Sequence, residues 1–206
     1  MEYLSINNIA FEVIGYAVSW VELIGTLFGL ACVWLATKPN ILTWPTGIVN
    51  VICLFILFYQ VQLYADMFLQ VFFLMTTLYG WYYWKKEPGE ESISTITTKI
   101  KWILLGLIFL GTFASGLLFG NLHELFPKYF TIAADYPYVD SLVMVLSVVA
   151  TILLARKKLE NWYLWILVDV ICVFLFCIKG IYFLAGLYFI FLFIATYGLL
   201  NWKSKM

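Results

Sequence analysis

The chain consists mainly of long apolar runs that are separated by short polar segments. A membrane-spanning helix needs about 20 consecutive, mostly apolar residues. The runs lack the strict alternation of apolar and polar residues that marks the strands of a membrane barrel, so helices are the expected elements. The pattern predicts seven transmembrane helices, at residues 20–36, 44–60, 66–84, 102–120, 139–155, 162–178 and 181–200.

The composition indicates that lipid is the solvent of this chain. Hydrophobic residues make up 64% of it and charged residues only 12%, whereas a soluble domain carries about 25% charged residues. Such a chain has too few polar side chains to cover a surface in water. Twelve basic residues balance twelve acidic ones, so no net charge attracts nucleic acid. We expect an all-α membrane protein that does not bind nucleic acid.

The basic residues are divided unevenly between the two predicted faces. Ten of the twelve lie in loops and ends on one face, and only Lys128 and Lys179 lie on the other. Because basic loops stay in the cytoplasm, we expect the N-terminus outside and the C-terminus inside. The external residues 1–18 are predicted to form a short interfacial helix, because Phe11 and Tyr16 alternate loosely with polar residues.

The two halves of the chain resemble each other. Three matches share an offset of 118 or 119 residues, namely SWVE (19–22) with PYVD (137–140), NVIC (50–53) with DVIC (169–172), and YGWYYWK (79–85) with YGLLNWK (197–203). A constant offset over three helices predicts an internal duplication.

The duplication predicts two three-helix repeats, at residues 19–84 and 138–206. A cytoplasmic loop with a linker helix (85–120) and an external segment (121–137) connect them, and the polar stretch 85–99 is expected to be flexible. A single connecting helix makes the repeats parallel, with a solute site near the membrane midplane between them. Purely structural membrane proteins also duplicate, so a structural role is the alternative.

Polar residues inside the predicted spans are candidates for the site, because their burial in a membrane is costly. Asn50 and Asp169 occupy equivalent repeat positions, about 10 Å into their helices at 1.5 Å per residue. Trp165 lies four residues before Asp169 and therefore on the same helix face. An indole beside a carboxylate suits a planar cationic ring. The structural alternative is a hydrogen bond that holds the two halves together.

Further residues complete the predicted substrate-binding site. Trp44 and Trp162 begin the second and sixth spans, where a role in the interfacial aromatic belt is the alternative. Gln60 and Lys179 are equivalent residues at outer helix ends, and they are either solvated loop residues or an outer gate. The remaining candidates for lining the pocket are Gln70, Tyr79 and Tyr188.

The sequence gives no indication of enzymatic or metal chemistry. Motifs for nucleotide binding, zinc proteolysis and serine hydrolysis are absent, so we expect neither an enzyme nor a cofactor. The four cysteines lie in apolar runs, where thiols serve as small hydrophobes. Glu22 and Asp140 lie at equivalent helix starts, where a carboxylate is stabilised by the helix dipole.

Four segments resemble the PnuC family of vitamin transporters, and the resemblance extends over about residues 19–206. They are WPTGIVNVICLFILFYQVQLYADMFLQ (44–70), YGWYYW (79–84), ENWYLWILVDVICVFLF (160–176) and KGIYFLAGLYFIFLFIATYGLLNW (179–202). The resemblance implies a 3+1+3 helix fold like that of the SWEET sugar transporters, in the bacterial cytoplasmic (inner) membrane. It also implies facilitated diffusion of an unphosphorylated vitamin that a cytoplasmic kinase traps. A homo-oligomer is a further expectation.

Two substrates follow from the resemblance. Carriers of nicotinamide riboside in this family have Asn at the position of Asp169 and Gln at the position of Lys179. A carboxylate suits the cationic thiazolium and the amino group of thiamine, so thiamine is the predicted substrate and nicotinamide riboside is the alternative. Two other classes stay open, a proton-coupled symporter that titrates Asp169 and a membrane receptor that binds without transport.

Overall fold

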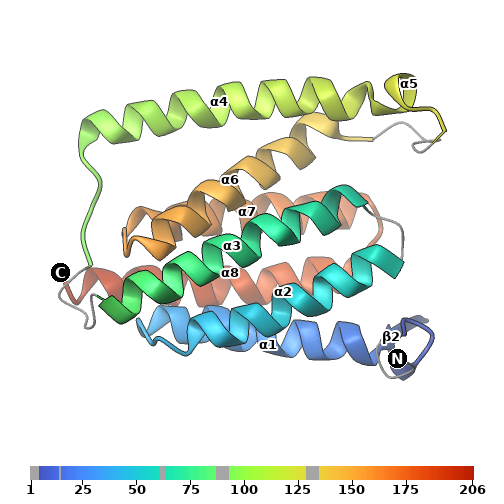
Figure 1. Ribbon diagram of the computed structural model, residues 1–206, viewed down its shortest axis with the longest axis horizontal. Helices are drawn as coiled ribbons and strands as arrows, with labels where there is room; N and C mark the ends of the chain where they lie inside the picture. Colours follow the sequence, from blue (N-terminus) through green and yellow to red (C-terminus); the bar gives the residue numbers. More distant parts are fainter. Residues whose placement is uncertain (1–4, 14, 61–63, 87–92, 129–134) are drawn as a thin grey trace. The chain divides into compact units, whose positions relative to one another are not determined.

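A computed structural model of the chain describes residues 5–13, 15–60, 64–86, 93–128 and 135–206, which are mainly helical (Figure 1). Each predicted span coincides with one long helix, and the boundaries agree to within four residues. In chain order the elements are β1 (Ile9–Val13), β2 (Tyr16–Ser19), α1 (Trp20–Thr37), α2 (Thr43–Gln60), α3 (Tyr64–Lys86), α4 (Thr98–Gly120), α5 (Leu122–Leu125), α6 (Pro137–Ala155), α7 (Glu160–Ile178) and α8 (Tyr182–Lys203).

Six helices in the described part of the chain are long and apolar enough to cross a membrane, namely α1, α2, α4, α6, α7 and residues Leu184–Lys203 of α8. α3 is helical where a further span is predicted but is not among the six. The count of seven spans therefore stays a prediction, whereas a mainly helical chain with six candidate membrane spans is observed.

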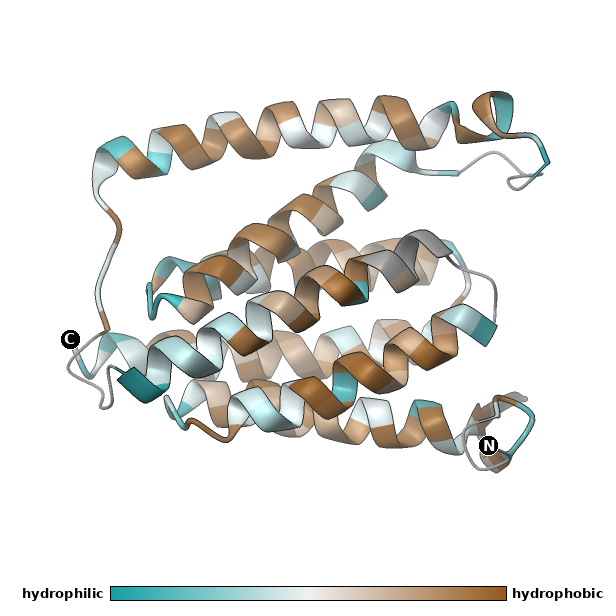
Figure 2. Ribbon diagram, in the orientation of Figure 1, coloured by the Kyte–Doolittle hydropathy of each residue, from teal (hydrophilic) through white to brown (hydrophobic). Residues whose placement is uncertain are grey.

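Bulky apolar side chains are exposed along the long helices. Phe109 of α4 is 71% exposed, and Phe193 and Leu200 of α8 are each 62% exposed. Figure 2 shows hydrophobic residues along much of α2, α4 and α6. Contact of so much apolar surface with water would be unfavourable, whereas lipid chains cover it at no such cost.

The segment before α1 is a β-hairpin, so the predicted interfacial helix was wrong. β1 and β2 pair antiparallel, with Phe11 opposite Val18 and Val13 opposite Tyr16. Gly15 at the turn has φ of 77°, a backbone conformation that glycine adopts readily. The segment is rich in β-branched and aromatic residues, which favour strands. Its loose alternation of apolar and polar residues is the period of a strand.

The chain divides into two compact units. The first comprises Met1–Ile93, Ala155–Lys157 and Ile194–Met206, and the second comprises Ser94–Leu154 and Lys158–Phe193. The first unit therefore contains the hairpin and α1 to α3, the second contains α4 to α7, and α8 contributes to both.

Close backbone contacts hold the helices of the first unit together. α1 and α2 pack against each other (Figure 1). A Cβ atom placed on Gly29 of α1 would lie 2.8 Å from Nδ2 of Asn50 on α2. A Cβ atom on Gly80 of α3 would overlap the indole ring of Trp44 on α2. Glycine at these positions lets the helices approach closely, as is usual in membrane bundles.

Two buried tryptophans connect helix ends within the first unit. Trp84 Nε1 at the end of α3 donates to the carbonyl oxygen of Ala155 over 3.1 Å. Trp202 Nε1 at the end of α8 donates to the carbonyl oxygen of Ala36 on α1 over 3.0 Å. The tryptophans are 118 residues apart and the alanines 119, so the two hydrogen bonds join equivalent positions. The last helix of each sequence half holds the first helix of the other half.

In the second unit the start of α4 is attached to the start of α7. The backbone N–H of Ile96 donates to the Glu160 carboxylate over 3.1 Å, and Lys101 forms an ion pair with the same carboxylate at 3.0 Å. The Thr97 hydroxyl caps α4 by accepting a hydrogen bond from the N–H of Ile100. These contacts extend α4 four residues before its predicted start.

The prediction of a flexible 85–99 loop was therefore wrong for the part that precedes α4. The carbonyl oxygen of Ser94 accepts from the N–H of Leu159 over 2.9 Å, and its hydroxyl accepts from Lys158 Nζ over 2.6 Å. The rest of this loop, residues 87–92, and residues 129–134 of the predicted external segment lie outside the described residues.

Candidate functional site

One face of α7 carries the most distinctive side chains of the second unit. Trp165, Asp169, Cys172 and Phe176 are spaced by four, three and four residues, so they follow one another along the same side of the helix. Trp165 and Phe176 pack against a buried apolar cluster that includes Cys172. The predicted pairing of Trp165 with Asp169 on one face agrees with this helix.

The cluster behind this face contains residues from three helices. Ile108 of α4, Leu146 of α6, and Val168 and Cys172 of α7 are all buried in it. Close packing of apolar side chains keeps α7 in a defined rotation. Asp169 directly follows Val168 of this cluster along α7.

Asp169 is a buried carboxylate, with only 3% of its surface exposed. The three salt bridges within the described residues join Lys101 to Glu160, His123 to Glu124 and Lys179 to Asp140, and none includes Asp169. An ionisable side chain buried in an apolar helix, with no salt bridge among the described residues, is a candidate for a functional site.

Tyr188 of α8 completes the aromatic lining of this face. Its ring stacks on Phe176 with centroids 5.4 Å apart and an interplanar angle of 24°. Its hydroxyl is also hydrogen-bonded to Cys172. The structure thus brings the predicted residues Trp165, Asp169 and Tyr188 to one region of the second unit.

The sequence interpretation missed two members of this face. Phe176 was unremarkable within an apolar run, and Cys172 was predicted only as a small hydrophobe. Cys172 is 1% exposed, which agrees with that prediction. Its hydrogen bond with the Tyr188 hydroxyl depends on the packing of α7 against α8, which the sequence does not show. The spacing of these residues from Asp169 could have placed both on the same face.

Trp44 and Trp162 are buried rather than placed in an exposed aromatic belt. They are 3% and 1% exposed, respectively. The Trp44 ring meets Trp84 edge-on, with centroids 5.1 Å apart. Trp44 Nε1 has no hydrogen-bond acceptor among the described residues, which leaves a buried donor available to a ligand.

Asn50 and Gln70 are the polar candidates inside the first unit. Asn50 Nδ2 donates to the carbonyl oxygen of Gly25 on α1 over 2.8 Å. This bond joins two helices of the same half, so it differs from the predicted structural alternative, a bond between halves. Gln70 of α3 is 5% exposed. Facing of Asn50 and Asp169 across a two-fold axis stays a prediction.

The ring of Tyr79 on α3 contacts the guanidinium of Arg156, a contact that the sequence analysis did not predict. The Arg156 guanidinium is 5.3 Å from the Tyr79 ring and equally far from the Tyr83 ring. Tyr79 is 38% exposed. Its observed contact is a cation–π interaction, and a place in the substrate pocket stays a prediction.

Gln60 and Lys179, the predicted outer pair, have different partners in the two units. Gln60 Oε1 accepts from the backbone N–H of Ile6 over 2.9 Å. Lys179 Nζ lies 3.4 Å from the Asp140 carboxylate and 5.8 Å from the centre of the Tyr136 ring. Both side chains are therefore held by contacts and are more than solvated loop residues.

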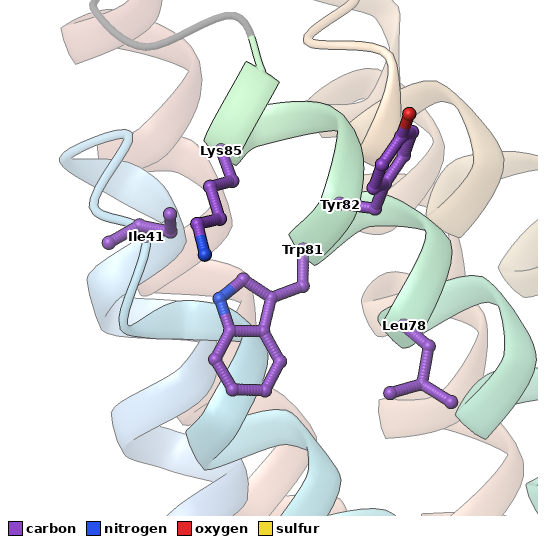
Figure 3. A pocket seen from close by; sticks show the side chains of 5 residues that line it. All are labelled: Ile41, Leu78, Trp81, Tyr82 and Lys85. Atoms are coloured by element: carbon purple, nitrogen blue, oxygen red, sulfur yellow. The ribbon is translucent and has the colours of Figure 1, made fainter.

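An open groove of about 380 Å³ lies elsewhere on the first unit (Figure 3). It contains none of the predicted site residues. All its side chains are exposed, and a tryptophan and a lysine side by side at a helix end are typical of the membrane interface. The groove is lined by Ile41, Leu78, Trp81, Tyr82 and Lys85.

Residues 19–204 match the protein family described as "Nicotinamide mononucleotide transporter". The chain is 33% identical to the nicotinamide riboside transporter PnuC of Escherichia coli, over all of this chain and 95% of that protein. It is 28% identical to the riboflavin/roseoflavin transporter RibM of Streptomyces davaonensis, over 96% of this chain and 91% of that protein.

The fold is similar to that in a crystal structure of the vitamin B3 transporter PnuC. The TM-score is 0.68, with 21% sequence identity over 90% of this chain and 81% of that one. At this identity the likeness establishes the fold.

Proposed function

Because the chain belongs to the nicotinamide mononucleotide transporter family, we propose that it carries unphosphorylated nicotinamide riboside into the cell by facilitated diffusion. The chain is a multi-pass membrane transporter and not an enzyme. The observation that carries the choice of substrate is 33% identity to a nicotinamide riboside transporter along the whole chain. The similar proteins are named for nicotinamide riboside or riboflavin, not for thiamine, so the comparisons favour the alternative substrate of the sequence analysis.

The α7 face has the chemistry to hold the nicotinamide ring. Nicotinamide riboside contains a pyridinium ring, which is planar and carries a fixed positive charge. The Trp165 indole offers a surface for stacking and the Asp169 carboxylate neutralises the charge. Tyr188 provides a second aromatic surface. The electrostatic attraction between these groups and the ring is stronger where water is excluded.

Further predicted residues are candidates for the remaining contacts by their chemistry alone. The indole N–H of Trp44 and the side chains of Asn50 and Gln70 can bind the amide and ribose hydroxyls. Tyr79 and Trp162 line the pocket in the same proposal. Gln60 and Lys179 act where the substrate enters.

Thiamine is the second candidate, and Asp169 is the observation that favours it. The resemblance to the PnuC family implies Asn at this position in its carriers of nicotinamide riboside. A buried carboxylate accepts a hydrogen bond from the amino group of the thiamine pyrimidine and attracts its thiazolium. The same residue is the proton carrier in the alternative of proton-coupled symport.

We infer a bundle of seven spans with two parallel three-helix repeats around a linker helix. The reciprocal hydrogen bonds of Trp84 and Trp202 support this arrangement, because they join positions that the repeat makes equivalent. The ten-to-two distribution of basic residues supports an external N-terminus and a cytoplasmic C-terminus. The location is the bacterial inner membrane, and association into a homo-oligomer is part of the same proposal.

The driving force for uptake comes from outside this chain. A facilitative carrier equalises the vitamin concentration across the membrane, and a cytoplasmic kinase then traps the imported vitamin by phosphorylating it. A non-transporting receptor would bind the vitamin without moving it.

Uptake into proteoliposomes tests this proposal. Purified protein should bring labelled nicotinamide riboside to equal concentrations inside and outside with no ion gradient, and an uncoupler should leave the rate unchanged. Protein-free liposomes are the control. Accumulation that requires a proton gradient would establish the symporter, and binding without uptake would establish the receptor.

A further inference from the structure

The second unit has a direct ion pair at its predicted external end. Asp140 lies in the first turn of α6 and Lys179 directly follows α7. Lys179 Nζ is 3.4 Å from both carboxylate oxygens of Asp140. The pair therefore connects the start of α6 to the end of α7.

The equivalent residues of the first unit are held differently. Glu22 lies 118 residues before Asp140, and Gln60 lies 119 residues before Lys179. The Tyr16 hydroxyl of β2 donates to Glu22 Oε1 over 2.7 Å, and the backbone N–H before the hairpin, at Ile6, donates to Gln60. The N-terminal segment therefore binds both Glu22 and Gln60, whereas their equivalents in the second half bind each other directly.

The segment is itself firmly connected to α1. The N–H of Trp20 donates to the carbonyl oxygen of Asn8 over 3.0 Å, and Val18 of β2 is 2% exposed. The Ser19 hydroxyl accepts from the N–H of Glu22 and caps α1. Figure 1 shows β2 at the N-terminal end of α1. A short ordered segment thus reaches from one helix to the next.

We propose that the N-terminal segment, residues 6–13 and 15–19, forms a strap that ties the start of α1 to the end of α2, and that it does in the first half what the Asp140–Lys179 ion pair does in the second. Gln60 has no charge with which to bind Glu22, and the hairpin supplies the missing connection. Alternating access opens one side of such a bundle at a time. The strap therefore controls the separation of α1 and α2 on the side where the hairpin lies.

Amide hydrogen exchange of the purified protein tests the strap without using any substrate. Tyr16→Phe removes one hydroxyl from a side chain that is 44% exposed, so the protein should still fold. Release of Glu22 should loosen the whole strap and raise exchange at residues 56–60, the end of α2 where Gln60 accepts from the N–H of Ile6, by about threefold to tenfold. Tyr163→Phe on α7, where the tyrosine is 50% exposed, is the matched control.

A second substitution asks whether the ion pair can replace the strap. In the Tyr16→Phe protein, Gln60→Lys should restore slow exchange because Lys can pair with Glu22 as Lys179 pairs with Asp140. Gln60→Met, of similar length but uncharged, should not restore it. Unchanged exchange at 56–60 in Tyr16→Phe would overturn the proposal. So would equal exchange in the Gln60→Lys and Gln60→Met backgrounds.

Discussion

Gly80→Ala tests whether the packing of Trp44 is as tight as the structure shows. A Cβ atom at this position would overlap three carbon atoms of the Trp44 ring. The ring has little room to move, because Trp44 is 3% exposed and its neighbour Trp84, which it meets edge-on, is 2% exposed. Overpacking of this kind costs about 1–3 kcal/mol, and alanine regains about 0.5–1 kcal/mol of helix propensity.

Because the overlap involves three ring carbons, the cost lies in the upper part of that range. The expected net loss is therefore about 1–2.5 kcal/mol, which lowers the melting temperature of a chain of this size by about 2–10 °C. Thermal unfolding in detergent, followed by tryptophan fluorescence, measures it. Gly186→Ala on α8 is the matched control, because nothing lies within 4 Å of a Cβ atom there, and it should not lower the melting temperature. Equal melting temperatures of the Gly80→Ala and wild-type proteins would refute this account of Trp44.

Three further predictions concern other parts of the chain. Trp202→Phe should cost about 1–3 kcal/mol of stability, because the buried carbonyl oxygen of Ala36 loses its donor; a loss no larger than that of a control at the 70%-exposed Trp102 would contradict this. Asp169→Asn should weaken thiamine binding by about 1.5–3 kcal/mol, the range for a hydrogen bond to a charged group. Nicotinamide riboside binding should weaken by less, because thiamine loses both the charge and the carboxylate acceptor of its amino group, whereas nicotinamide riboside loses the charge alone; calorimetric titration that gives equal losses would contradict the difference. Burial, the hydrogen bond to Glu22 and the negative charge of Glu22 raise the pKa of Tyr16 from 10.0 to about 12. The contribution of Tyr16 to stability is therefore complete below pH 10 and is lost as the pH rises through about 12. The absorbance titration of the wild-type protein minus that of Tyr16→Phe should have its midpoint near the higher value, and a midpoint near 10 would contradict it.

Most of the long helices could be predicted from the sequence because each of the six candidate spans is an apolar run of membrane length, a property of local composition alone. The hairpin could not, because Phe11 and Tyr16 alternate with polar residues in a way that fits a strand as well as a loose helix. The early start of α4 also depends on distant chemistry. Glu160 is 64 residues from Ile96 in sequence, and only the fold brings its carboxylate to that N–H.

The candidate site was predictable to the extent that it follows helix geometry. Trp165 and Asp169 share a face because they are four residues apart, and this needs no tertiary structure. The stacking of Tyr188 on Phe176 and the position of Arg156 over Tyr79 involve different helices, so no local pattern contains them. The choice of the proposed substrate depends on similarity to known transporters, because a carboxylate and an indole suit more than one cationic ring.

Counterflow in proteoliposomes tests the central claim most directly. Vesicles that contain the purified protein are loaded with unlabelled nicotinamide riboside or thiamine and diluted into a trace of the labelled compound. We expect vesicles loaded with nicotinamide riboside to take up labelled nicotinamide riboside transiently above equilibrium, with no ion gradient and no ATP. Counterflow of thiamine alone would contradict the proposed substrate, and the absence of counterflow with both compounds would contradict vitamin transport by this chain.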